Sequence, residues 1–321
     1  MSLDYIKVFA PATVANVACG FDVLGFAIDS PGDEVELTKS DTGEVRITKI
    51  IGDGGKLPTD ADKNTAGVVV KAFLEAIGSK QGIDIVLHKH MPLGSGMGSS
   101  AASSAAAVYA ANKLMGSPLS DLEILPFAME GERIACGSAH ADNVAPSLLG
   151  GFTLIRSYSP LDVVKIDVPD ELFATVVHPK IVVNTKDARK ILKGQVPLDK
   201  AIRQWGNVGA LIAGLLQKDY GLISRSLEDV IIEPVRSLLL PGFDEAKQAA
   251  LEAGALGFGI SGSGPSLFSL NRGKKTAETV AHAIKSVYDG LGIETDLFVS
   301  AVNQQGPSII RSNESDSAKT I

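Results

Sequence analysis

The chain has 321 residues, of which 45% are hydrophobic and 21% are charged. This length exceeds what one hydrophobic core usually needs and suits two domains, and the composition is that of a soluble globular protein. The formal net charge of −7, with no local cluster of lysine and arginine, disfavours nucleic acid and anionic membranes as partners.

Cysteine usage indicates a reducing compartment. The chain has only Cys19 and Cys136, too few for a disulfide framework and without the C-x-x-C spacing of a redox or zinc site. The apolar stretch over residues 8–28 is interrupted by Pro11 and Asp22, so we interpret it as folded protein rather than as a secretion signal. These features together predict a cytoplasmic protein.

Hydrophobic periodicity predicts a mixture of strands and helices along the chain. The expected strands cover residues 6–9, 33–38, 83–88, 152–156, 172–177, 266–270 and 295–301. The expected helices cover residues 65–77, 99–115, 122–135, 199–217, 220–226, 244–253 and 276–291. Trp205, in one of these helices, is expected in the core.

This order of elements predicts an α+β fold in two parts. We place an N-terminal, nucleotide-binding domain at residues 1–158 and a C-terminal domain at residues 159–310. The polar tail, residues 311–321, is predicted to be disordered.

The most informative segment is a glycine-rich loop that leads into an alanine-rich helix. Alternating glycines permit positive φ angles and close approach to a ligand, while free N–H groups at the helix start attract anions. An ordinary turn into a buried helix is the alternative. The Walker lysine is absent, so a Walker-type loop is excluded. The candidate phosphate-binding residues are Pro92, Leu93, Gly94, Ser95, Gly96, Met97, Gly98, Ser99, Ser100, Ala101 and Ala102.

This loop resembles the P-x-G-x-G-[LM]-G-S-S-[GSA] signature of the GHMP kinases. Residues 11–25 resemble the P-x-T-x-A-N-x-G-x-G-F-D motif of one family among them, the homoserine kinases, with Ala18 in place of a glycine. Residues 259–266 resemble the glycine-rich loop that closes the GHMP active site. Residues 257–262 also fit the G-x-G-x-x-G dinucleotide pattern, but Pro265 and a strand follow instead of a helix.

The resemblance implies a two-domain GHMP kinase fold, with an N-terminal ribosomal-protein-S5-like β-α-β domain and a C-terminal ferredoxin-like domain. It implies ATP-dependent phosphorylation of the side-chain hydroxyl of L-homoserine, a step in threonine biosynthesis, with Mg²⁺ as cofactor. Homodimers are common in the family, so a homodimer is expected.

The resemblance also assigns substrate-binding residues. Arg189 and Arg236 suit an α-carboxylate through bidentate hydrogen bonds, and Asp22 suits an ammonium group. Taken singly, these are ordinary surface charges or a turn residue, and only their joint appearance in family order favours a site. The candidate substrate-binding residues are Asn16, Asp22, His140, Thr185, Arg189, Arg236 and Gly262.

Asn64 resembles the position that contacts adenine in the family. Ser100 and Glu132 are the candidate metal ligands, because Mg²⁺ takes few ligands from protein. On charge pattern alone Glu132 is an ordinary solvated helix residue, and Glu130 is the alternative carboxylate.

The candidate catalytic residues are Asp142, Asn143 and His140. Whether Asp142 is a general base stays open, because a loose phosphoryl-transfer transition state depends mainly on positioning and charge stabilisation. Asn143 is the alternative positioning group.

Two other functions remain as alternatives at this point. One is a GHMP kinase for another acceptor, such as mevalonate, shikimate or a sugar, against which the pair of arginines with Asp22 argues. The other is a regulator that binds ATP without turnover, against which the retained Ser100 and Glu132 argue.

Overall fold

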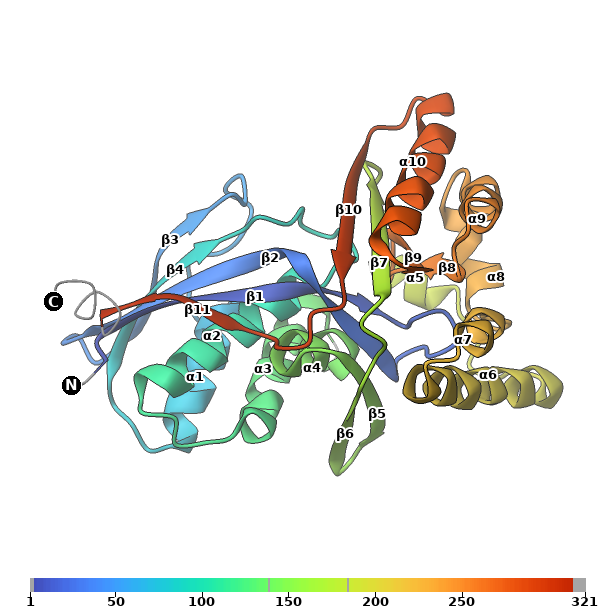
Figure 1. The fold of residues 1–321 in the computed structure, drawn as a ribbon. Coiled ribbons are helices and arrows are strands. Elements are labelled where there is room, and N and C mark those ends of the chain that lie inside the picture. Colours follow the sequence, from blue (N-terminus) through green and yellow to red (C-terminus); the bar gives the residue numbers. More distant parts are fainter. Residues whose placement is uncertain (1–2, 138, 184, 314–321) are drawn as a thin grey trace, which may run out of the picture.

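The computed structural model describes residues 3–137, 139–183 and 185–313, which fold around two β-sheets (Figure 1). The strands of the first sheet are β1 (Tyr5–Ala15), β2 (Leu24–Ser40), β3 (Val45–Ile51), β4 (Gly82–His88), β5 (Phe152–Tyr158), β6 (Leu161–Ile166) and β11 (Ser308–Ser312). Their order is β11-β1-β2-β4-β3, with β5 paired to β2 and β6 paired to β5. The pairs are antiparallel except β3 with β4, which is parallel.

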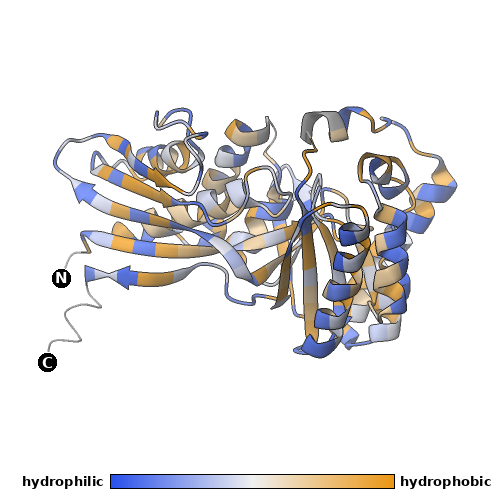
Figure 2. Ribbon diagram, turned by 90° about the horizontal axis from the view of Figure 1, so that it is seen from above, coloured by the Kyte–Doolittle hydropathy of each residue, from blue (hydrophilic) through white to orange (hydrophobic). Residues whose placement is uncertain are grey.

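Helices cover one face of the first sheet (Figure 1). They are α1 (Thr65–Ala76), α2 (Ser99–Leu114), α3 (Asp121–Cys136) and α4 (Ala141–Leu149). Hydrophobic and hydrophilic residues alternate along the strands of this sheet (Figure 2), as expected when one face packs on helices and the other meets water. The alanines and serines of α2 are almost all buried. Because these side chains are small, α1, α3 and α4 can approach α2 closely.

The second sheet is antiparallel throughout and has the order β10-β7-β9-β8. Its strands are β7 (Leu172–Pro179), β8 (Gly257–Ile260), β9 (Leu267–Arg272) and β10 (Thr295–Ala301). The helices of this part of the chain are α5 (Thr185–Lys190), α6 (Leu198–Gln217), α7 (Tyr220–Ser226), α8 (Glu233–Arg236) with the short 3₁₀ helix η1 (Ser237–Leu239), α9 (Phe243–Glu252) and α10 (Lys274–Gly290). The predicted α+β class is confirmed.

Several elements were not expected. Helix α4 contains Pro146, which in a sequence indicates a break because it has no N–H for the carbonyl four residues earlier. That carbonyl belongs to Asp142 and lies against Gly25, where a Cβ would stand 1.8 Å from it. The strands β3, β6 and β11 are short edge or near-edge strands with little buried surface, so their hydrophobic pattern is weak.

The chain end differs from the predicted tail. Arg311 and Ser312 belong to β11, where they pair with Lys7 and Ile6 of β1, because an open edge of the first sheet offers backbone partners even to polar residues. The rest of the predicted tail from residue 314 lies outside the described residues. Because β6 and β11 both join the first sheet, we propose that the division between the two parts of the fold follows the sheets rather than a single point in the chain.

Trp205 was expected in the core, but its side chain is 59% exposed on α6. The apolar positions of α6 are divided between two faces, and periodicity cannot tell which one packs. Cys19 is buried, as expected for a small apolar side chain. Within the described ranges, we find no helix with the length and hydrophobicity needed to cross a membrane.

Candidate active site

The candidate phosphate loop joins β4 to α2. Its glycines Gly94, Gly96 and Gly98 have φ angles of +72°, +81° and +69°, which only glycine adopts easily. Gly98 immediately precedes α2, and a Cβ there would stand 2.2 Å from Thr13 Oγ1. Backbone strain and lack of space therefore both require glycine. The first N–H groups of α2 have no acceptor within their own helix, so this end of α2 has donors that suit an anion.

Three segments carry the sequence motifs, and they meet at this loop. The first covers residues 11–25, the second is the loop itself with the start of α2, residues 92–102, and the third covers residues 259–266. Hydrogen bonds join every pair of these segments, among them Thr13 N to Met97 O (3.0 Å), Ser261 Oγ to Gly96 O (2.7 Å), and Gly262 N to Ala15 O (3.2 Å). A Cβ on Gly96 would approach the carbonyl oxygens of Ser261 and Gly264 to 2.7 and 2.8 Å. The phosphate loop is thus held by both of the other segments, although they lie far apart in the sequence.

One cavity of about 460 Å³ lies beside this junction. The candidate residues that line it are Asn16, Asp22, Asn64, Leu93, Gly94, Ser95, Gly96, Gly98, Ser99, Ser100, Glu132, His140, Asp142, Asn143, Arg189, Arg236 and Gly262. Residues from both parts of the fold therefore share one cavity.

Some candidate residues do not line the cavity. Met97, Ala101 and Ala102 are buried in the hydrophobic core, so they support the loop from behind. Pro92 begins the loop without reaching the cavity wall. Thr185 begins α5, but its side chain lies outside the described part of the structure, as does Asn184 before it.

Asn64 is 3% exposed and stands at the start of α1. Its Oδ1 accepts a hydrogen bond from Ala66 N at 3.1 Å, and its Nδ2 donates to Pro58 O at 2.9 Å. The side chain therefore caps α1 and holds the preceding loop against it. This arrangement shapes the cavity wall, and a contact with adenine stays a prediction.

The two carboxylates considered for a metal ion lie in different surroundings. Glu132 is 6% exposed and hydrogen-bonds Ser100, whereas Glu130 pairs with Arg133 at 2.6 Å on the surface. Burial raises the pKa of Glu132, while the hydrogen bond with Ser100 and the charge of Lys89 oppose the rise. Across the described residues, no group of three or more histidine, cysteine, aspartate or glutamate side chains is placed to bind a metal.

The other end of the cavity carries opposite charges side by side. Arg189 Nη2 donates to Asp22 Oδ2 at 2.5 Å. Asn16 holds the turn that presents this aspartate, because its Oδ1 accepts from Asp22 N at 3.0 Å. Its Nδ2 donates to Gly262 O at 2.8 Å and so fixes the turn to the third motif segment.

Arg236 is 5% exposed and makes hydrogen bonds to backbone carbonyls. Its Nε donates to Ala188 O at 3.1 Å, and its Nη1 donates to Gly262 O at 3.0 Å. Burial lowers the pKa of Arg236, and the charge of Asp22 is the largest influence that raises it. A guanidinium that is held by neutral carbonyls beside the cavity keeps its positive charge available for an anionic group.

Phe21 lies next to both arginines. The guanidinium carbons of Arg189 and Arg236 are 5.6 and 5.0 Å from the centroid of its ring, within the range of cation–π attraction. The aromatic ring therefore helps to hold two like charges at one end of the cavity. The sequence motif contained Phe21, but a single phenylalanine gives no signal that separates this position from core packing.

His140, Asp142 and Asn143 stand at the start of α4. The pKa of Asp142 is raised to about 7, chiefly by burial and next by the charge of Asp22. Burial lowers the pKa of His140, whose Nδ1 is 3.8 Å from Asp22 Oδ1. Asn143 Oδ1 accepts from Thr13 Oγ1 at 2.8 Å, at the end of the phosphate loop.

A buried ion pair beneath the loop was missed from the sequence. Lys89 Nζ pairs with Asp33, and also donates to Ser99 O at 2.9 Å and Ser103 Oγ at 2.7 Å. Asp33 accepts from Ser99 Oγ at 2.8 Å and from the backbone of His90 at 2.8 Å. The pair joins β2 to the first turn of α2, and no local pattern shows that a charge within β2 meets the charge that follows β4.

These elements, a glycine loop at the start of α2 and a two-sheet α+β fold, are those of the GHMP kinases. Residues 64–151 match the family model "GHMP kinases N terminal domain", and residues 211–290 match "GHMP kinases C terminal". A crystal structure titled as mevalonate kinase shares the fold, with a TM-score of 0.70 at 15% identity over 94% of this chain and 99% of that one.

Closer relatives narrow the family. A protein named homoserine kinase from Chloroherpeton thalassium is 55% identical over 94% of this chain and 98% of its own length. A protein of the same name from Chlorobaculum tepidum is 56% identical over 94% of this chain and 97% of its own length. The crystal structure of homoserine kinase from Cytophaga hutchinsonii is 60% identical, covers 96% of this chain and 98% of that one, and has a TM-score of 0.94. The chain belongs to the homoserine kinase family of the GHMP kinases.

Proposed function

We propose that this chain transfers the γ-phosphoryl group of ATP to the side-chain hydroxyl of L-homoserine, which gives ADP and O-phospho-L-homoserine. The observation that carries this proposal is the charge arrangement in the cavity. Asp22 and the guanidinium groups of Arg189 and Arg236 gather at one end, and the phosphate loop lies in the same cavity. The ammonium and carboxylate groups of an amino acid suit the charged end of this cavity, and a hydroxyl on its side chain would then face the phosphate loop.

Binding of the amino acid would replace contacts that the protein already makes with itself. Asp22 pairs with Arg189 in this structure. An α-ammonium group would take the place of the arginine at Asp22, and an α-carboxylate would meet Arg189 and Arg236. Each charge exchanges one partner for another, so little charge is left without a partner when water leaves the cavity.

The nucleotide phosphates would bind at the start of α2. The N–H groups after Gly98 and the positive end of the helix dipole supply favourable interactions without a lysine in the loop. The buried pair of Lys89 with Asp33 holds the first turn of α2 in place through Ser99. Positioning and charge stabilisation provide most of the rate enhancement in phosphoryl transfer.

The residues present fit a magnesium ion. A carboxylate and a hydroxyl that line the same cavity, Glu132 and Ser100, are an adequate protein contribution, because Mg²⁺ usually keeps water and phosphate oxygen as its other ligands. When bound, the ion would neutralise charge on the β- and γ-phosphates. It would also keep Glu132 ionised, against the effect of burial on its pKa.

The acceptor hydroxyl would lie near Asp142 and Asn143. With a pKa of about 7, Asp142 is partly ionised at neutral pH and can accept the hydroxyl proton as the new bond to phosphorus forms. Asn143 stands beside the phosphate loop and suits positioning. Asp142 is thus proposed as a proton acceptor and Asn143 as an orienting group.

The proposal is tested by ADP release with ATP and Mg²⁺ and a panel of acceptors: L-homoserine, mevalonate, shikimate, galactose and none. Of this panel we expect turnover with homoserine alone, and we expect Arg236→Ala to lower kcat/KM for homoserine about a hundredfold, to a value that is still measurable, with ATP binding retained. Turnover with another acceptor would reject the amino-acid pocket, and ATP binding without turnover would indicate a regulator. Matched controls use Arg225→Ala, an arginine on α7 that does not line the cavity.

Two further features stay predictions. A homodimer is expected from the family, and sedimentation equilibrium of the purified chain tests it. A cytoplasmic location is expected from the cysteine usage, and it is tested by subcellular fractionation of cells that express the protein.

A further inference from the structure

Arg236 depends on a very short helix for its position. Helix α8 has only 4 residues, Glu233–Arg236, and ends at this arginine. An isolated helix of this length is not stable, because it forms too few hydrogen bonds to offset the conformational entropy lost in helix nucleation. The structure must therefore contain other contacts that fix α8 and set where the guanidinium group points.

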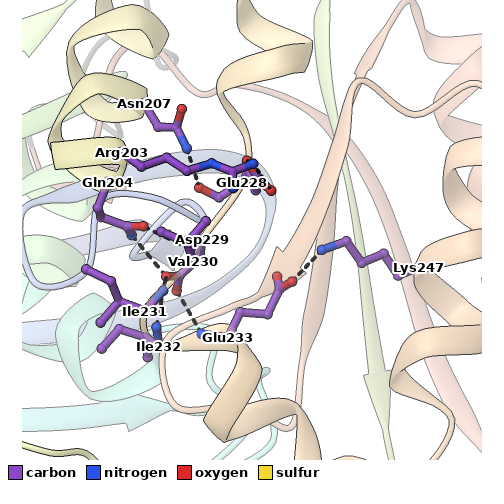
Figure 3. Close-up of polar contacts among 10 residues, drawn as sticks. All are labelled: Arg203, Gln204, Asn207, Glu228, Asp229, Val230, Ile231, Ile232, Glu233 and Lys247. Carbon is purple, nitrogen blue, oxygen red and sulfur yellow. Dashed lines mark hydrogen bonds and ion pairs between the residues drawn. The ribbon is translucent and has the colours of Figure 1, made fainter. Parts of the chain in front are cut away.

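Asp229 supplies the contacts at the start of α8 (Figure 3). Its Oδ1 accepts hydrogen bonds from the backbone N–H groups of Ile231 and Ile232, each at 2.9 Å. Its Oδ2 accepts from Glu233 N, also at 2.9 Å. Asp229 is only 8% exposed, so three donors that would otherwise lack acceptors converge on one buried carboxylate.

Gln204 connects this cap to the turn that carries Cys19 and Asp22. From α6, its Nε2 donates to Asp229 Oδ1 at 3.0 Å and to Cys19 O at 2.9 Å, and its Oε1 accepts from Val230 N at 3.0 Å. Cys19 lies in the turn that carries Asp22. The amide side chain of Gln204, which is 8% exposed, therefore links the start of α8 to the backbone of this turn.

A second contact fixes the other side of α8. Glu233, the first residue of the helix, forms an ion pair with Lys247 of α9 (Figure 3). The cap and this ion pair hold the two sides of a single helical turn. The guanidinium group at its end can then keep its bonds to Ala188 and Gly262.

We propose that Asp229 is a positioning residue for recognition of the substrate carboxylate, which acts by fixing Arg236 relative to the Asp22 turn through Gln204. This inference rests on the proposed function, because it concerns the same pocket. It adds a specificity-determining residue that does not itself line the cavity.

The charge of Asp229 acts in the same direction as its hydrogen bonds. It favours the charged form of the buried Arg236, against the effect of burial on the pKa of that residue. Burial raises the pKa of the nearby Cys19 thiol to about 12, and the charge of Asp229 adds to this rise. An uncharged residue at position 229 would therefore weaken both the geometry and the field at the arginine.

The test compares Asp229→Asn with Glu228→Gln in the full-length enzyme. Asparagine keeps the shape but replaces one acceptor by a donor that faces backbone N–H. Glu228 is the matched control, because it lies next in sequence and its side chain only pairs with Arg203 at 2.7 Å on the surface. Circular dichroism and thermal unfolding check that each variant is folded.

Two acceptors separate carboxylate recognition from a general defect. L-Homoserine carries the carboxylate, and 3-amino-1-propanol has the same hydroxyl and ammonium groups without it. For Asp229→Asn we expect kcat/KM with homoserine to fall about tenfold or more, the usual scale for lost charge-assisted hydrogen bonds. The value with aminopropanol and the KM for ATP should stay within about twofold, and Glu228→Gln should match wild type throughout.

A double-mutant cycle tests whether Asp229 acts through Arg236. In an Arg236→Ala background, Asp229→Asn should cause little further loss, because the group that it positions is gone. An equal loss in both backgrounds would overturn the proposal. So would parallel losses with both acceptors, or an Asp229→Asn enzyme that matches Glu228→Gln.

Two outcomes need separate treatment. If Asp229→Asn does not fold, Gln204→Ala replaces it, since this variant leaves the carboxylate and its three backbone hydrogen bonds in place and removes the contacts of Gln204 with Cys19, Asp229 and Val230. The same loss, selective for homoserine, is then expected, and a loss shared by both acceptors overturns the proposal. Absence of homoserine turnover in the wild-type enzyme would reject the proposed function itself, an outcome distinct from all of these.

Discussion

The phenol hydroxyl of Tyr158, at the end of β5, donates a hydrogen bond to the backbone oxygen of Asp22 at 2.8 Å. The hydroxyl oxygen of Tyr158 in turn accepts a hydrogen bond from Ala141 N at 3.3 Å, in the first turn of α4. One side chain thus joins the turn that presents Asp22 to the helix that presents Asp142. The ring of Tyr158 also packs edge-on against His140, with centroids 6.3 Å apart.

Removal of this hydroxyl is therefore expected to loosen the substrate end of the cavity. Tyr158→Phe keeps the ring and loses both hydrogen bonds, each of which contributes on the order of 1 kcal/mol. We expect KM for homoserine to rise about three- to tenfold, with KM for ATP unchanged. Steady-state kinetics check this, with Tyr109→Phe on α2, outside the cavity lining, as control. Equal changes in both KM values would contradict it.

Asp142 links activity to pH. If it accepts the hydroxyl proton, kcat rises with pH through about 7, where the buried carboxyl ionises. Asp142→Asn should then lose about two to four orders of magnitude in kcat and the pH dependence with it. A small loss with an unchanged pH profile would instead assign Asp142 to positioning alone.

The same carboxyl predicts a pH effect on stability. Its pKa in the folded protein, about 7, exceeds that of an unfolded aspartate, about 4, so the folded state binds the proton more tightly. The resulting stabilisation is complete below about pH 4 and is lost as pH rises through about 7. Asp142→Asn should therefore unfold at a higher temperature than wild type at pH 8, with the difference shrinking towards pH 4. Thermal unfolding across pH measures this, and a constant difference would contradict it.

The buried pair beneath the phosphate loop should be important for stability. Lys89→Met leaves the charge of Asp33 buried without its cation, which costs about 3–5 kcal/mol in comparable cases. Urea unfolding should show a loss of that size, and KM for ATP should rise because the start of α2 shifts. The control is Lys71→Met, which removes an exposed pair with Asp62 and should cost about 0–1 kcal/mol.

A double variant separates charge burial from the remaining contacts. In Lys89→Met combined with Asp33→Asn, no ion is left buried, so part of the lost stability should return. A double variant less stable than the Lys89 single variant would contradict the account of Asp33 as an uncompensated charge.

The sequence predicted α10 well because one periodic pattern covered the whole helix, and it predicted α2 well because its run of alanines strongly favours a helix. It failed where a single residue obscured the pattern: Pro146 concealed α4, and the two apolar faces of α6 misplaced Trp205. The site was predictable because its glycines and serines lie in one continuous segment. Lys89, Tyr158 and Asp229 were not, because each acts through a partner that only the tertiary fold brings within reach.

Two glycines of the phosphate loop allow a matched comparison. Gly94 and Gly98 have nearly equal φ angles, +72° and +69°, so a change to alanine strains the backbone similarly at both. They differ in space: a Cβ on Gly94 meets nothing within 4 Å, whereas one on Gly98 would stand 2.2 Å from Thr13 Oγ1 and 2.9 Å from Asn143 Oδ1. Only Gly98→Ala should therefore displace the start of α2.

For Gly94→Ala we expect a loss of about 1 kcal/mol in stability and a modest rise in KM for ATP. For Gly98→Ala we expect ATP binding to weaken at least tenfold more than in Gly94→Ala, because the N–H groups of the first turn move with the helix start. Calorimetric titration with ATP and Mg²⁺ measures both. Equal weakening in the two variants would mean that backbone strain alone sets the effect, and that contact of the loop with Thr13 and Asn143 does not control nucleotide binding.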